Sequence, residues 1–188
     1  MKRRSSKLLV LLLTAITGLA GCVTHEASVR SRLDSSGFTV ATMGDPIVLS
    51  RPTPQLAASA RDYAYVGPVE INHMGEREHY LWVGLASTVD RQFESVSPDT
   101  VDTLVLLVDG QPMMLPLDDW VTSLDQLPYD TIAPLYATLA ARASLDQIQR
   151  IASAESVEVH VVTNDGSAAN YRMWQGDFPS WSLLGNAE

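Results

Sequence analysis

One short segment of the chain gathers the side chains that could bind a metal ion. It reads His73-Met74-Gly75-Glu76-Arg77-Glu78-His79. Imidazole nitrogens and carboxylate oxygens are ligands for zinc and other divalent ions. A hairpin turn here would bring the segment's candidate metal ligands into one loop: His73, Glu76, Glu78 and His79. The alternative is an ordinary hairpin surface, on which alternating Glu and Arg residues form cross-strand ion pairs.

Tryptophan offers a second kind of chemistry, because an indole ring stacks on flat ligands such as sugar rings and also anchors protein interfaces. The chain has four tryptophans: Trp82, Trp120, Trp174 and Trp181. Two of them, Trp120 and Trp181, are candidate binding residues on an exposed patch. The four together could also form a platform for a glycan or for peptidoglycan. The alternative is that these rings belong to the core.

Catalytic motifs are missing from the sequence. It contains no Gly-x-Ser-x-Gly elbow, no His-Glu-x-x-His pair, no Walker loop and no Gly-x-Gly-x-x-Gly turn. The sequence therefore favours a non-enzymatic protein without a cofactor. A hydrolytic or metal-binding protein centred on residues 73–79 is the alternative.

Three hairpins are predicted from apolar patterns around short turns. Residues 69–73 alternate, and an apolar run at 79–85 follows the Met74-Gly75 turn. This second arm is apolar on both faces, which predicts a strand inside the sheet. Two more hairpins are expected around Asp109-Gly110 and around residues 164–167.

Helical spacing begins only after residue 130. The apolar residues of this stretch fall on one helical face: Ile132, Leu135, Tyr136, Leu139, Ala140 and Ala143. Ser144 and Gln147 have the spacing of a capping box, which predicts a second, short helix. We therefore expect an α+β fold, an antiparallel β-sheet with one or two helices at about 131–153 packed on one face.

The N-terminus has the pattern of an export signal. Basic residues precede the apolar run Leu8–Ile16, and Leu19-Ala20-Gly21-Cys22 follows it. This last stretch resembles the lipobox of bacterial lipoprotein precursors. The resemblance implies that residues 1–21 are removed, that Cys22 is acylated, and that Val23 favours sorting to the outer membrane.

This interpretation divides the chain into three parts. Residues 1–21 are the signal peptide, 22–36 a lipidated N-terminus and flexible tether, and 37–188 a single domain. Cys22 is the only cysteine, so the domain has no disulfide and no cysteine metal ligand.

Charge restricts the partners of the expected mature chain. It holds nine arginines, no lysine and all 22 acidic residues, a net charge of −13. This charge disfavours nucleic acid and anionic lipid headgroups as ligands. The lipid on Cys22 would supply the membrane contact. The sequence thus predicts a protein-binding or envelope-assembly module on the outer membrane, whose partner is another envelope protein.

Overall fold

The computed structural model describes residues 29–89, 101–118, 124–164, 166, 168–175 and 181, with Asp102 and Gln175 described through their backbone alone. These residues form one antiparallel sheet of eleven strands and one short helix. The strands are β1 (Val29–Leu33), β2 (Thr39–Met43), β3 (Ile47–Pro52), β4 (Arg61–His73), β5 (Glu76–Ser87), β6 (Val101–Val108), β7 (Gln111–Leu115), β8 (Leu117–Asp118), β9 (Leu135–Arg142), β10 (Val157–Thr163) and β11 (Ala168–Gln175), and the helix is α2 (Leu145–Ala152).

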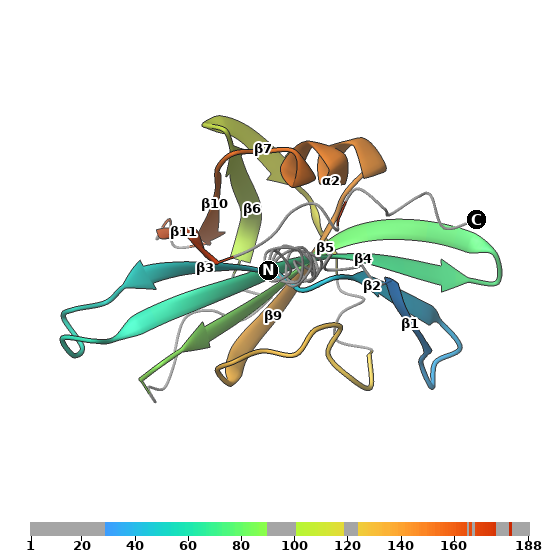
Figure 1. Cartoon of the computed structure of the whole chain (residues 1–188), viewed down its shortest axis with the longest axis horizontal. Helices are drawn as coiled ribbons and strands as arrows, with labels where there is room; N and C mark the ends of the chain where they lie inside the picture. Colours follow the sequence, from blue (N-terminus) through green and yellow to red (C-terminus); the bar gives the residue numbers. More distant parts are fainter. Residues whose placement is uncertain are drawn as a thin grey trace, which may run out of the picture.

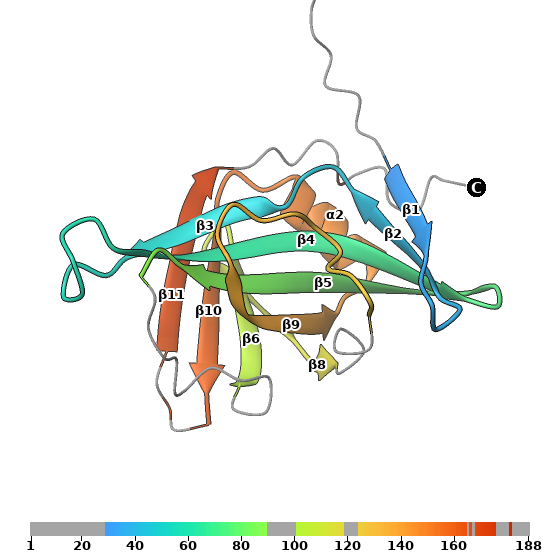
Figure 2. The same cartoon turned by 90° about the horizontal axis from the view of Figure 1, so that it is seen from below.

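Nine of the strands form a nearly closed barrel, in the order β7-β6-β10-β11-β3-β4-β5-β9-β8. The two end strands, β7 and β8, are separated in the chain by Pro116 alone, so the two ends of the sheet meet there. Proline has no N–H to donate to a strand ladder. It therefore suits this position, because the strand before it, β7, pairs with β6 and the strand after it, β8, pairs with β9. Figure 2 shows the long β4–β5 hairpin crossing the molecule with β9 beside it.

Apolar side chains fill the inside of the barrel. Alternating residues of each strand point inward, for example Leu81, Val83 and Leu85 of β5. Helix α2 lies next to β7 (Figure 1) and adds Ile148 and Ile151 to the same core. The interior of this barrel is therefore a packed core, as in other small barrels.

A second apolar cluster lies on the outer face of β2, β4, β5 and β9. The segment 124–134 covers it, and the buried ring of Tyr129 packs against Trp82 with 5.7 Å between ring centroids. Strands β4 and β5 are therefore buried on both faces, which explains their continuous apolar runs.

The structure confirms the three predicted hairpins. Met74 and Gly75 join β4 to β5 with φ of 53° and 96°, and Asp109 and Gly110 join β6 to β7 with φ of 50° and 75°. Two successive positive φ angles match the right-handed twist of the paired strands. β10 and β11 form the third hairpin, and β5 lies between β4 and β9 as expected.

The helix predicted over 131–143 is wrong. Residues 135–142 form β9, with Ala137, Leu139 and Ala141 facing the barrel core and Ala140 facing the outer cluster. A helix of this sequence would bury one face, whereas the strand buries both and pairs with β5 and β8. Tertiary packing thus outweighs the helix propensity of alanine.

The second predicted helix is confirmed as α2. Ser144 accepts a hydrogen bond from the Gln147 backbone N–H at 3.2 Å, and Gln147 Oε1 accepts one from the Ser144 N–H at 2.8 Å. The described fold is mostly β, a nearly closed antiparallel barrel with this one short helix, rather than the expected α+β sheet with one or two helices packed on one face. Within the described residues, no helix combines the length and the apolar character needed to span a bilayer.

Part of the expected tether belongs to the fold. Residues 29–33 lie within the predicted tether 22–36, yet they form β1 and pair with β2, from Val29 opposite Met43 to Leu33 opposite Thr39. Strand pairing thus extends at least to Val29, within the predicted tether.

The turn at Asp109 provides a test of the barrel's connections. Asp109 Oδ1 accepts hydrogen bonds from the backbone N–H groups of Glu155 (3.0 Å) and Ser156 (2.9 Å), just before β10. We expect Asp109→Ala to lower the free energy of unfolding by about 2 kcal/mol, since both bonds are lost and alanine resists a positive φ. Asp109→Asn keeps an acceptor oxygen, so urea denaturation should show about half that loss or less. Equal losses for both variants would contradict this role of the side chain.

Candidate binding surfaces

The hairpin β4–β5 carries the residues that the sequence offered as metal ligands, and the structure separates them. His73 pairs with Glu76, whereas His79 lies three positions along the ladder and pairs with Glu70. Because side chains alternate between the two faces of a strand, the two imidazoles lie on opposite faces of the hairpin. His73 contacts Phe38, with 4.8 Å between ring centroids, and His79 Nε2 lies 3.3 Å from Glu70 Oε2.

The two candidate carboxylates have other surroundings. Glu76 is exposed beside the turn, and Glu78 accepts a hydrogen bond from the Tyr80 hydroxyl at 2.8 Å and forms an ion pair with Arg142 at 2.7 Å. Burial, followed by this hydrogen bond, raises the pKa of Tyr80 to about 12. Across the part of the chain that the structure describes, no three His, Cys, Asp or Glu side chains gather in a metal-binding group.

The tryptophans are divided between core and surface. Trp181 is fully buried in the barrel core, so it is not the surface residue that the sequence suggested. Trp82 is fully buried as well, and Trp120 lies outside the described residues. Trp174 on β11 is exposed at 48% of its surface, the exposed tryptophan among those that the structure describes.

Trp174 belongs to a small surface that we call the aromatic platform, formed by Arg61, Tyr63 and Trp174. The Tyr63 ring meets the Trp174 ring edge-on, with 6.0 Å between centroids and 77° between planes. The Arg61 guanidinium lies over the Trp174 ring at 4.5 Å from its centroid. The platform therefore presents two aromatic rings and a cation on the outer face of β4 and β11.

Arg61 is one of three arginines, with Arg32 and Arg150, that form no ion pair with a carboxylate of the described residues. Five others form ion pairs with carboxylates: Arg30, Arg51, Arg77, Arg142 and Arg172. For Arg61, no carboxylate of the described residues lies within ion-pair distance, although the chain has many more acidic than basic residues. Its positive charge is therefore available to a ligand.

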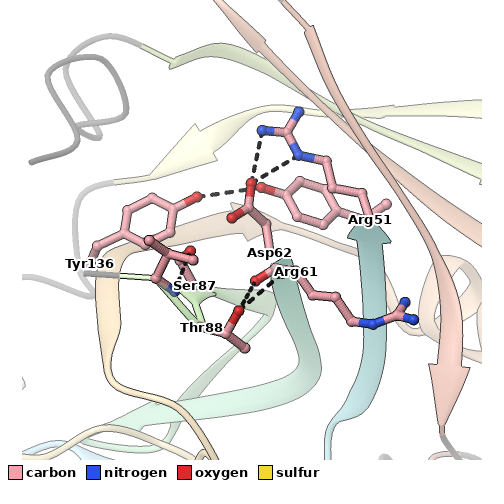
Figure 3. Close-up of polar contacts among 8 residues, drawn as sticks. Arg51, Arg61, Asp62, Ser87, Thr88 and Tyr136 are labelled. Carbon is pink, nitrogen blue, oxygen red and sulfur yellow. Dashed lines mark hydrogen bonds and ion pairs between the residues drawn. The ribbon is translucent and has the colours of Figure 1, made fainter. Parts of the chain in front are cut away.

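A buried ion pair lies on the opposite face of the same strand (Figure 3). Asp62 is fully buried, and its Oδ2 accepts hydrogen bonds from Arg51 Nε at 3.0 Å and Nη2 at 2.9 Å. The hydroxyls of Tyr136 and Tyr171 lie 3.4 Å apart beside this pair. Burial, together with the neighbouring Tyr171 and Asp62, raises the pKa of Tyr136 well above its ordinary value.

This inner cluster holds the platform in place. Arg61 and Asp62 are adjacent, so their side chains point to opposite faces of β4, as Figure 3 shows. The Arg51–Asp62 pair links β3 to β4, and Thr88 Oγ1 accepts a hydrogen bond from the Arg61 N–H at 3.0 Å. The Arg51–Asp62 ion pair and the hydrogen bond to Thr88 thus fix the part of β4 that carries the platform.

The second candidate surface is the edge of β1. Within the described residues this strand pairs with β2 alone, so one backbone edge has no paired strand. Two of its apolar side chains are exposed, Val29 at 41% and Leu33 at 75%. Unpaired edges with apolar side chains are templates for pairing with another chain.

Beside β1 lies a groove of about 720 Å³ between this strand and the segment 126–131. Arg32 connects β1 to this segment, because its guanidinium donates hydrogen bonds to the backbone carbonyls of Gln126 and Leu127 (2.9 Å for Leu127). These bonds attach β1 to the segment that covers the outer cluster, so β1 is firmly positioned.

Sequence reasoning missed both surfaces. The alternation of Arg61, Tyr63 and Tyr65 was the available signal for one, and the apolar residues of 29–33 were the signal for the other. Comparisons with protein-family models, with curated proteins and with solved structures found no match for this chain.

Proposed function

We propose that this protein is an outer-membrane-anchored lipoprotein that acts as a non-enzymatic protein-binding or envelope-assembly module. The edge strand β1 is the observation that carries this proposal. An extended segment of a partner can add to such an edge through backbone hydrogen bonds, while side chains such as Leu33 supply apolar contact.

The packed barrel supports binding at the surface rather than inside the fold. The interior of the described barrel is filled by apolar side chains and by Trp181, so its centre holds a core in place of a ligand chamber. The separation of His73 from His79 also favours this function over the metal-binding or hydrolytic alternative.

The position of β1 in the chain fits an anchored protein. Six residues of chain lie between Cys22 and Val29, and the seven Cα-to-Cα steps that join them span roughly 25 Å when fully extended. A lipid on Cys22 would therefore keep β1 close to the membrane, where it can meet membrane-bound partners. Two or more acyl chains make such anchoring stable.

Photocrosslinking in intact cells tests the proposal. A photoreactive residue at position 31 should crosslink to one discrete envelope protein. Two lysines on the edge, Val29→Lys with Leu33→Lys, should reduce this crosslink about tenfold, because buried charge opposes edge pairing. Leu56→Lys is the matched control, because Leu56 is similarly exposed, at 42%, and lies outside the strands. A crosslink that survives the two lysines would overturn the role of β1.

Cys22→Ser tests the anchor in the same cells. We expect this variant to leave the outer-membrane fraction and to lose metabolic labelling by palmitate, since the thioether can no longer form. A variant that stays in that fraction to the same extent as the natural chain would rule out the lipid anchor.

A further inference from the structure

We infer that the aromatic platform of Arg61, Tyr63 and Trp174 binds an acidic glycan, meaning a sugar chain that carries carboxylate groups. This site lies on a different surface from β1 and goes beyond the proposed function. It rests on the proposed function in one respect, because a location in the envelope brings glycans near the protein. Three observations carry it, namely the aromatic pair, the cation without a carboxylate partner, and the pairing of the strands below.

The aromatic pair supplies the surface for the sugar ring. One side of a pyranose ring presents C–H groups, which pack well against an exposed aromatic ring. Trp174 is 48% exposed, and its ring meets the Tyr63 ring edge-on with 6.0 Å between centroids. Both rings are carried by strands of one sheet, Tyr63 by β4 and Trp174 by β11 at the register shift between Met173 and Gln175.

Arg61 supplies recognition of the acid. A guanidinium that stacks on an indole keeps its N–H donors pointing outward in one plane, which suits a bidentate contact with a carboxylate. Stacking at 4.5 Å orders the side chain before the ligand arrives, so little conformational entropy is lost on binding. The positive charge of Arg61 is complementary to a carboxylate of the glycan.

The strand pairing favours a glycan over an acidic protein segment at this place. Strand β4, which carries Arg61 and Tyr63, is paired with β3 on one side and with β5 on the other. It has no free backbone edge to which an extended peptide could add, in contrast to β1. A sugar needs no such edge, because it binds by stacking and through side-chain hydrogen bonds.

Titration of the full mature protein, purified in detergent with its N-terminus intact, tests this site. The probes are soluble peptidoglycan glycan fragments without stem peptides, whose muramic acid units carry free carboxylates, the uncharged tetramer of N-acetylglucosamine, and the stem peptide without sugar. We expect the acidic glycan to bind about tenfold more tightly than the neutral one, the difference that one charge-assisted contact of about 1.4 kcal/mol produces. Binding is measured by calorimetry.

Variants separate the two parts of the site. Trp174→Ala should weaken binding of both glycans at least about tenfold, whereas Trp174→Phe should retain most of it. Arg61→Gln should weaken only the acidic glycan, to the level of the neutral one. Arg150→Gln is the matched control, because Arg150 is an exposed arginine on α2, away from the platform, and it should change nothing. Thermal melting of each variant verifies the fold.

Three results would overturn the site. These are no binding of the acidic glycan, binding unchanged in both Trp174→Ala and Arg61→Gln, or equal binding of the stem peptide alone, which would make the platform a peptide site. The titration uses neither the membrane nor β1. Its failure therefore leaves the proposed function standing, and failure of the crosslink at position 31 leaves the glycan site standing.

Discussion

Replacing Trp181 by alanine is expected to lower the free energy of unfolding by about 3–5 kcal/mol, the loss typical of a deleted core aromatic. The indole of Trp181 is fully buried and belongs to the same core as the strand residues that point into the barrel. Its removal leaves a cavity among side chains on several strands, and a barrel wall held by hydrogen bonds cannot collapse to fill it. Guanidinium denaturation followed by circular dichroism measures the loss.

Trp174→Ala is the matched control for this prediction. The residue type is the same, but the ring is half exposed and its main contacts are Tyr63 and the Arg61 guanidinium. We expect a loss of about 1 kcal/mol, since an exposed cation–π contact contributes about that much or less. Equal losses for the two variants would show that Trp181 does not act as a core residue.

The second large effect is expected for Gly67→Ala. A Cβ at position 67 would lie 2.9 Å from the Tyr129 hydroxyl oxygen and closer still to two ring carbons. Because Tyr129 is buried, its ring has to shift and its hydroxyl loses the hydrogen bond it donates to the Pro68 carbonyl at 2.5 Å. Overpacking and the lost bond together should lower the free energy of unfolding by about 3 kcal/mol.

A double-mutant cycle provides the control for Gly67→Ala. Tyr129→Ala removes the ring that the new methyl group meets, so adding Gly67→Ala to it should cost about 1 kcal/mol or less. Burial raises the pKa of Tyr129 well above the ordinary tyrosine value. Ultraviolet titration of Gly67→Ala should therefore show one tyrosine that ionises at lower pH than in the natural chain. A full loss of stability in the Tyr129→Ala background would contradict the steric cause.

The helix prediction shows where local patterns stop being sufficient. Residues 135–142 contain apolar residues at both helical and alternating spacing, so the sequence is compatible with either element. Ala140 lies opposite Trp82 in the ladder, where a small residue leaves space for the large ring. The strand is therefore selected by packing against β5, a contact that short-range periodicity does not contain.

The candidate surfaces follow the same logic. The metal hypothesis counted residues 73–79 as one cluster, but strand alternation sends His73 and His79 to opposite faces. The platform joins Arg61 and Tyr63 to Trp174, which lies far along the chain and reaches them only because β3 pairs with both β4 and β11. The separation of the histidines follows from the register of one hairpin, whereas the platform cannot be found without the strand order.

By itself, the sequence determined the features that depend on neighbouring residues: the three hairpins, the capped helix α2, and the lipobox-like stretch that ends at Cys22. Turns and caps are decided by local backbone geometry, which residues a few positions apart control. Only the tertiary structure decided that the sheet nearly closes, that Trp181 is core and Trp174 is surface, and that β1 is an edge. These depend on which distant strands pair, because pairing sets which face of every strand is buried.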